Sequence, residues 1–196
     1  MEKISRETFE SVRKYALAAE KEERFQHSVR VAETARRMCE IYGEDGDAGY
    51  FAGLAHDMCK DLDDGTLLSL AGHDGQAVSE IERKKPALLH GRAAAVKLER
   101  DFGVTDRDIL QSVAMHTLGG EGMCPLAKIV FAADKIEPGR PQSSEKYLRN
   151  LFSKKLDELL LAVVQENMDY LASRGKEIAP SSLVFKKSLE KSLGLL

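Results

Sequence analysis

The chain has 196 residues, of which 43% are hydrophobic and 31% charged, and its formal net charge is −3. This composition is typical of a folded globular protein and excludes a disordered or collagen-like chain. The length predicts one domain over residues 1–196, large enough to bury a core without disulfides or a structural metal. The slightly acidic balance argues against a nucleic-acid polymer as partner, since such proteins usually present a basic face. The longest apolar run, 159–164, falls far short of the roughly 20 residues of a membrane-spanning helix, so we expect no membrane partner.

Apolar residues recur at helical spacing through the N-terminal half. Three stripes with this period are Phe9-Val12-Ala16-Ala19, Val31-Ala35-Met38-Tyr42 and Ala48-Phe51-Ala52-Ala55. Gly43 ends the second stripe, as glycine commonly does just after a helix. Pro86 suits the first turn of a helix from about Ala87 to Phe102.

The C-terminal half shows the same period. Thr105 with Asp108 resembles a capping box and predicts a helix through His116. Pro125 predicts the start of another helix. Further helices are expected from Leu156 to near Gly175 and over 182–192. No segment alternates apolar and polar residues for long enough to predict a strand, so the fold class is all-α, with roughly eight to ten helices.

Three cysteines, Cys39, Cys59 and Cys124, form no Cys-x-x-Cys pair. An odd number without such spacing predicts no disulfide framework and favours a reducing, cytoplasmic location. We expect each of them to act as a small buried apolar residue.

The residues that can carry chemistry are mainly histidines: His27, His56, His73, His90 and His116. Directly after His56 stands Asp57, and neighbouring helical residues about 100° apart can both reach an ion beyond a helix end. Such a dipeptide is common by chance and is a weak signal alone. Asp134 lies in an apolar helical stretch, where a carboxylate is costly unless it is paired or binds a metal. Histidine and carboxylate ligands without thiolate suit manganese, iron or zinc.

The order His27, His56-Asp57, Asp134 resembles the H…HD…D signature of the HD-domain metal-dependent phosphohydrolases. Five longer motifs resemble the YqeK-type branch, the bacterial symmetrical dinucleoside-tetraphosphatases. They are Arg24-Phe25-Gln26-His27-Ser28, His56-Asp57-Met58-Cys59-Lys60, Leu88-Leu89-His90-Gly91, His116-Thr117-Leu118-Gly119 and Ala133-Asp134-Lys135-Ile136-Glu137-Pro138-Gly139-Arg140. The resemblance implies an HD-type helical bundle with a motif-bearing core at about 20–140, followed by C-terminal helices at about 145–193.

The resemblance also implies two divalent metal ions. One would be held by His27, His56, Asp57 and Asp134, and the other by His90 and His116, with Asp57 bridging. Iron is the metal that the resemblance favours, while manganese or zinc also fits such ligands. The implied reaction is the symmetrical cleavage of diadenosine tetraphosphate to two ADP, with a hydroxide shared by the two ions as the nucleophile.

Substrate phosphates need positive partners besides the metals. Lys60 lies three residues after Asp57, on roughly the same side of the helix end, and is expected to take part in catalysis beside Asp57. Arg140 offers a planar guanidinium directly after a Pro-Gly turn. Thr117 and Gly119 can offer a hydroxyl and backbone N–H groups to an anion. Arg24 fits either a phosphate ligand or a salt-bridge partner, whereas Lys135 and Glu137 are expected to support the site structurally.

Two other interpretations stay open. One is a different HD-type reaction, on a nucleoside monophosphate, a cyclic dinucleotide or an alarmone. The sequence has no adjacent histidine pair, which argues against the cyclic-dinucleotide reaction. Met58-Cys59-Lys60 stands where alarmone hydrolases usually carry an acidic pair, which argues against the alarmone reaction. The other is a nucleotide-binding sensor with little turnover. A homodimer could form through Leu183, Val184, Leu189 and Leu193, or this segment could fold back onto the core.

Overall fold

A computed structural model describes residues 4–196, so the first three residues of the predicted 1–196 unit lie outside it. The described part contains eleven α-helices and one 3-10 helix, η1, and no strand, which confirms the all-α class. In chain order these are α1 (Arg6–Ala19), α2 (Glu22–Tyr42), α3 (Gly46–Ala55), α4 (Asp64–Ala71), α5 (Glu80–Lys84), η1 (Pro86–Leu89), α6 (His90–Phe102), α7 (Arg107–Met115), α8 (Pro125–Ile136), α9 (Glu145–Phe152), α10 (Leu156–Ser173) and α11 (Pro180–Ser192).

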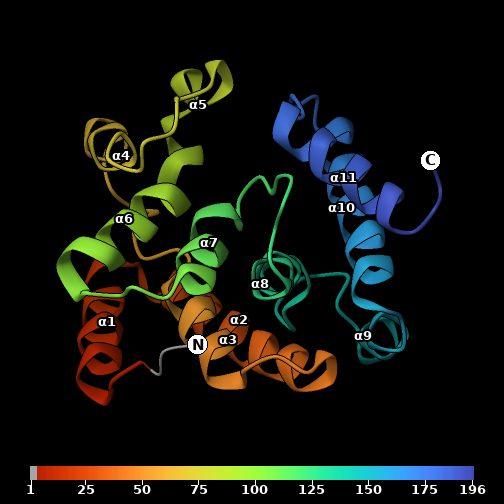
Figure 1. The fold of residues 1–196 in the computed structure, drawn as a ribbon, viewed down its shortest axis with the longest axis horizontal. Coiled ribbons are helices and arrows are strands. Elements are labelled where there is room, and N and C mark those ends of the chain that lie inside the picture. The colour runs from red at the N-terminus through yellow and green to blue at the C-terminus, as the bar shows by residue number, and fades with distance from the viewer. Residues whose placement is uncertain (1–3) are drawn as a thin grey trace.

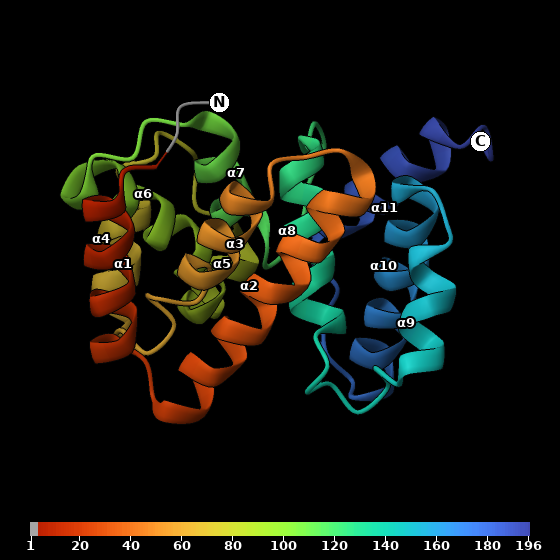
Figure 2. The same ribbon diagram turned by 90° about the horizontal axis from the view of Figure 1, so that it is seen from below.

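Helix α8 runs through the middle of the bundle. It packs against α2, α3, α7 and α10, and eight of its twelve residues are buried. Helices α1, α4 and α6 lie at one end of the molecule and α9, α10 and α11 at the other (Figure 1). Figure 2 shows the same division from below, with α2 and α3 side by side between the two ends. The chain segments before and after α8 both pack against it, and they also meet directly, as where the hydroxyl of Tyr42 donates to the carbonyl of Lys154 at 3.1 Å.

Helices α2 and α3 approach one another closely because two glycines face α2. A Cβ on Gly53 would lie 2.7 Å from the Cα of Ala32, and one on Gly49 would lie 2.5 Å from the sulfur of Cys39. Such contacts are too short for any side chain, so both positions require glycine. This packing holds the C-terminal end of α3 against α2.

Three details differ from the sequence-based predictions. The cap of α7 is Asp106, not Thr105: its carboxylate accepts from the N–H groups of Asp108 and Ile109, and aspartate directly before the helix is a strong N-cap. The helix expected from Ala87 is split into η1 and α6, since the tighter turn comes first. The short helices α4 and α5 were not predicted, because eight and five residues show little apolar periodicity. Helix α9 falls within the C-terminal helices expected at about 145–193, although its own bounds were not predicted.

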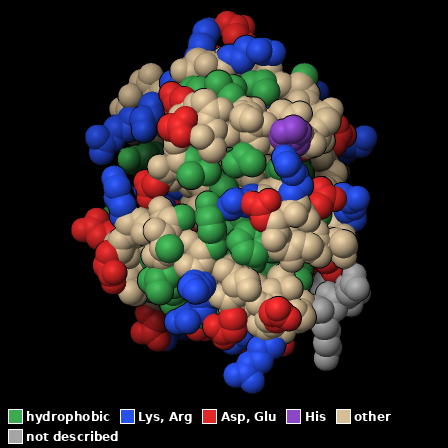
Figure 3. All heavy atoms as spheres, turned by 90° about the vertical axis from the view of Figure 1, so that its left-hand side faces the viewer, with side chains coloured by type: hydrophobic (Ala, Val, Ile, Leu, Met, Phe, Trp, Pro, Cys, Tyr) green, Lys and Arg blue, Asp and Glu red, His purple; other side chains and the backbone are tan. Residues whose placement is uncertain are grey.

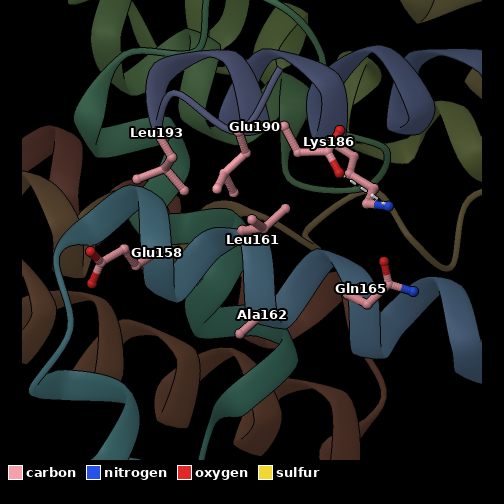
Figure 4. A pocket seen from close by; sticks show the side chains of 8 residues that line it. Glu158, Leu161, Ala162, Gln165, Lys186, Glu190 and Leu193 are labelled. Atoms are coloured by element: carbon pink, nitrogen blue, oxygen red, sulfur yellow. Dashed lines mark ion pairs between the residues drawn. The ribbon is translucent and has the colours of Figure 1, made fainter.

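The C-terminal segment folds back onto the core. Leu189 of α11 is buried, whereas Leu183 and Val184 are 51% and 45% exposed, so the four residues considered for a dimer surface do not share one face. A groove of about 530 Å³ lies between α10 and α11, lined by Leu161, Ala162 and Leu193 and by charged side chains (Figure 4). It contains none of the predicted site residues.

Charges of both signs alternate over the face formed by α1, α4 and α6, with apolar patches between them (Figure 3). No helix among residues 4–196 combines the length and apolar character needed to cross a bilayer. The three cysteines are free thiols: Cys39 and Cys59 are buried, whereas Cys124 is half-buried and caps α8 through its sulfur.

Candidate metal centre

Three histidines stand where helices begin or end: His56 follows α3, His90 begins α6 and His116 follows α7. In each, Nδ1 faces the carbonyl oxygen three residues earlier, at 2.7 Å for Gly53–His56, 2.6 Å for Ala87–His90 and 2.7 Å for Val113–His116. A carbonyl only accepts, so Nδ1 carries the proton and Nε2 of the neutral ring keeps its lone pair. All three rings are buried, and their Nε2 atoms point into one interior space.

Asp57 lies at the centre of this group. Its Oδ1 is 2.9 Å from Nε2 of His90 and 3.5 Å from Nε2 of His116. Its Oδ2 is 3.8 Å from Nε2 of His56 and 3.4 Å from Nη1 of Arg24. One carboxylate thus touches three imidazoles that come from three separate helices.

His27 and Asp134 extend the group toward α2 and α8. Nε2 of His27 lies 3.0 Å from Oδ1 of Asp134, and the same oxygen is 3.8 Å from Nε2 of His56. The four imidazole rings form a chain, with centroids 5.3 Å apart for His27–His56 and 4.8 Å apart for both His56–His116 and His90–His116. The structure therefore brings together all six residues that were predicted as metal ligands.

The donor set fits a divalent cation. Donor atoms of His27, His56 and Asp134, and likewise those of His56, Asp57 and His116, all lie within 4.8 Å of one another. Nε2 of His56 is buried and has no hydrogen-bond partner, which is costly unless a cation takes its lone pair. Nε2 of His90 and Nε2 of His116 are only 2.9 Å apart, although both Nδ1 protons are committed to carbonyls. Cations bound to these three Nε2 atoms would satisfy the lone pair of His56 and would stabilise the close approach of His90 and His116.

The electrostatics favour the deprotonated form of His56, His116, Asp57 and Asp134, whereas the neighbouring Asp134 and Glu137 outweigh burial and raise the pKa of His27. Burial lowers the pKa of His56, and it lowers the pKa of His116 to about 3. Burial acts in the opposite direction on Asp57, but the neighbouring His56, His116 and His90 outweigh it and hold the pKa of this carboxyl well below its usual range. Burial is likewise outweighed at Asp134, where Lys135 and His27 lower the pKa of the carboxyl. Neutral imidazoles and ionised carboxylates are the forms that bind metals.

Cationic side chains surround the carboxylates. Nζ of Lys60 lies 3.0 Å from Nε2 of His90 and 3.9 Å from Oδ1 of Asp57, and burial lowers the pKa of this lysine. Arg140 donates to Oδ1 of Asp134 at 2.7 Å and to its backbone carbonyl at 2.8 Å. Lys135 donates to Oδ2 of Asp134 at 2.9 Å and to the carbonyl of His116 at 2.8 Å. The site is thus prepared for an anion even though the whole chain is slightly acidic.

Arg24 forms a two-point ion pair that the sequence did not reveal. Its Nε and Nη2 donate to the carboxylate of Asp61 at 2.9 and 3.2 Å, and its Nη1 lies near Asp57. The structure shows Arg24 as a salt-bridge partner, and its role as a phosphate ligand stays a prediction. Asp61 stands one helical turn after Asp57, which is the only sequence signal that could have pointed to it.

Thr117 and Gly119 lie on the turn after α7. The hydroxyl of Thr117 is 3.2 Å from Nε2 of His90 and 3.3 Å from Nε2 of His116, so it borders the cluster. The N–H of Gly119 already donates to the carbonyl of Met115 at 2.9 Å. This N–H is therefore engaged within the turn, and binding of an anion by the turn at Thr117 and Gly119 stays a prediction. Glycine is required there because φ is +67° and a Cβ would collide with the ring of Phe185.

The remaining predictions concern residues outside the cluster. His73 lies exposed after α4, away from the other histidines, as its glycine-flanked position indicated. Glu137 is buried and accepts from Nδ1 of His27 at 3.1 Å and from Nε of Arg30 at 2.6 Å. A supporting role for Glu137 was predicted. The ion pair of Arg30 with Glu137 was not, because no sequence spacing links two residues 107 positions apart.

Comparisons with known proteins agree with this geometry. The HD domain family matches residues 24–139. A Staphylococcus aureus relative named "Bis(5'-nucleosyl)-tetraphosphatase, symmetrical" is 37% identical over 63% of this chain and 64% of its own length, so the chain spans just under two thirds of it. A Halalkalibacterium halodurans relative with the same name is 29% identical over 83% of this chain and 86% of its own length.

A crystal structure from Clostridium acetobutylicum, described as a predicted HD superfamily hydrolase involved in NAD metabolism, superposes with a TM-score of 0.86. It is 28% identical and covers 94% of this chain and 97% of its own. The range matched by the HD family holds all six residues of the cluster and more than half of the chain. The chain therefore belongs to the HD domain family.

Proposed function

We propose that this protein is a metal-dependent hydrolase of dinucleoside polyphosphates that splits diadenosine tetraphosphate symmetrically into two ADP. The observation that carries the proposal is the convergence of four imidazole Nε2 atoms and two carboxylates on one buried space. The relatives from Staphylococcus aureus and Halalkalibacterium halodurans, both named as symmetrical tetraphosphatases, support the choice of substrate.

The six donors would divide between two ions. His27, His56, Asp57 and Asp134 would hold one ion, and His90 and His116 would hold the other. Asp57 would serve both, because its carboxylate lies within 4 Å of three of the four imidazoles. Iron is favoured by family resemblance, and manganese or zinc suits the same donors. Such a pair of ions supplies a nucleophile from water at neutral pH and neutralises charge that builds on phosphate oxygens.

The chain's own cations bind and orient the polyphosphate. Lys60 is held at the rim of the cluster, where its ammonium meets a phosphate oxygen as a point charge. The side chain of Arg140 is 38% exposed, so it can donate to a phosphate while its Nε stays on the carbonyl of Asp134. The hydroxyl of Thr117, close to Nε2 of both His90 and His116, adds a neutral donor.

Arg24 and Gly119 act indirectly. Arg24, held by Asp61, places its Nη1 3.4 Å from Oδ2 of Asp57 and orients this carboxylate. Gly119 shapes the turn that carries Thr117, because its left-handed backbone lets Phe185 pack beneath it. Burial of the imidazoles by α3, α6 and α7 excludes water from the inner side of the site.

Product analysis tests the proposal directly. Metal-loaded protein is incubated with diadenosine tetraphosphate at neutral pH, and the nucleotides are separated. ADP as sole product supports symmetrical cleavage. AMP with ATP would overturn the assignment of the broken bond, and no product from protein with two ions per chain would overturn the assigned substrate, in favour of another phosphate ester or a sensor.

A further inference from the structure

His27 is anchored differently from the other three histidines. His56, His90 and His116 each donate Nδ1–H to a carbonyl three residues earlier in their own turn. For His56 and His116 the carbonyls are available because the last turn of an α-helix leaves several without an N–H partner. For His90 the carbonyl belongs to the 3-10 helix η1, directly before α6. His27 stands inside α2, where the preceding carbonyls are engaged in the helix. Its Nδ1 therefore needs an acceptor from another part of the chain.

Glu137, directly after α8, supplies this acceptor from 110 residues away. Its carboxylate is 2% exposed and lies 3.1 Å from Nδ1 of His27. It also accepts from Nε of Arg30 at 2.6 Å and from the N–H of Gly139 at 2.5 Å. Burial raises the pKa of this carboxyl, but Arg30 and the N–H of Gly139 outweigh burial and lower it, so the group stays ionised.

Arg30 and Gly139 hold the carboxylate of Glu137 in place. Arg30 lies one turn after His27 on α2. The guanidinium that binds Glu137 and the imidazole that Glu137 binds therefore belong to the same helix. A Cβ on Gly139 would come within 2.6 Å of Nε of Arg30, so any other residue would have to displace the guanidinium from its present position. These contacts fix the carboxylate of Glu137 relative to His27.

We infer that Glu137 is a positioning residue for His27: it selects the tautomer with the proton on Nδ1, aims Nε2 at Asp134 and raises the basicity of this nitrogen. A carboxylate behind an imidazole is a common support for a metal ligand, and its loss typically weakens metal binding about 10- to 100-fold. The effect is local, because Glu137 contacts none of the other three histidines in the described contacts. The inference rests on the metal site of the proposed function.

The test is a calorimetric titration of metal-free protein with Mn²⁺ alone, which needs no nucleotide. We expect two binding events in the unaltered protein. Glu137→Leu weakens one event about 10- to 100-fold and leaves the other within about twofold. Glu137→Gln keeps an oxygen acceptor and loses the charge, so we expect its affinity in the weakened event to lie between those of the unaltered protein and Glu137→Leu.

Glu82→Leu is the matched control. Glu82 is also a buried carboxylate paired with an arginine, since Nη1 of Arg92 lies 3.2 Å away, but no histidine contacts it. We expect this variant to lower the midpoint of thermal unfolding and to keep both Mn²⁺ affinities.

Two outcomes would overturn the inference. One is an unchanged pair of affinities in Glu137→Leu. The other is an equal weakening of both events together with a loss of thermal stability like that of Glu82→Leu, which marks a purely structural role. Absence of any Mn²⁺ binding in the unaltered protein would refute the metal site itself. Two Mn²⁺ events without hydrolysis of diadenosine tetraphosphate would refute the function and leave the inference standing.

Discussion

The helices from α2 to α8 and the three helices from α9 to α11 are built on different principles. In the described part of the chain, every buried polar or charged side chain lies between Glu20 and Ser143. The C-terminal helices bury apolar side chains only, such as Leu159, Leu160 and Phe185. Burying polar groups is costly unless they are paired, so the first region holds the chemistry and the second adds apolar stabilisation.

The two regions meet at the turn after His116. The ring of Phe185 from α11 packs beneath Gly119 and against Phe131 of α8, with ring centroids 5.2 Å apart. The hydroxyl of Ser182 donates to the carbonyl of Leu118 at 2.7 Å. The C-terminal helices therefore brace the turn that carries Thr117, although the HD family match ends before them.

The largest effect is expected in the region from α2 to α8, at His56 and Asp57. His56→Ala and Asp57→Ala each remove a central donor, so we expect loss of bound metal and a fall in hydrolysis of at least ~10³-fold. Metal content by atomic emission and a turnover assay measure both. His73→Ala, at an exposed histidine, is the control and should match the unaltered protein. Turnover with full metal content in either ligand variant would contradict the assignment.

Lys60→Ala should have the next largest effect. Removing a cation that meets the phosphates is expected to lower kcat/KM about 10²-fold, whereas the metal content stays unchanged because Lys60 is not a proposed ligand. Lys60→Arg keeps the charge but not the compact ammonium, so we expect partial activity. Steady-state kinetics of both variants decide this, and a kcat/KM of Lys60→Ala close to that of the unaltered protein would exclude a role for Lys60.

Gly119→Ala probes the junction between the two regions. We expect a loss of about 2–4 kcal/mol in the free energy of unfolding, from backbone strain plus the collision with Phe185. Gly122→Ala is the matched control: φ there is +73° and no atom lies within 4 Å of the added Cβ, so strain alone applies and about 1 kcal/mol is expected. Urea unfolding of both variants measures the difference, and equal losses would mean that Phe185 does not restrict the turn.

The smallest effect concerns a buried carboxyl in the polar region. Burial raises the pKa of Glu20 to about 7, against the opposing hydrogen bond from Ser28 at 2.8 Å. The folded state then binds more protons than the unfolded state between pH 4.5 and 7, so the contribution of Glu20 to stability is lost as the pH rises through this window.

Glu20→Gln removes this titration. We expect the variant to unfold like the unaltered protein at pH 5 and to be about 1–2 kcal/mol more stable at pH 8. Urea unfolding of the metal-free proteins at both pH values measures the change. A stability difference that does not depend on pH would show that Glu20 is ionised throughout.

The sequence by itself determined the all-helical class and the residues of the cluster. Apolar period and glycine or proline breakers are local properties, and the motifs around His27, His56-Asp57, His90, His116 and Asp134 stand in an order that can be read along the chain. The short helices α4 and α5 were not found in this way, because they span only about two turns or fewer.

Only the tertiary structure decided which partners these residues meet. Arg24 binds Asp61, Glu137 holds His27, and Phe185 packs beneath Gly119. Each of these pairs is separated by 37 or more residues, so no local spacing encodes it. Packing brings such side chains together, and the need to pair every buried polar group then selects among the contacts that packing allows.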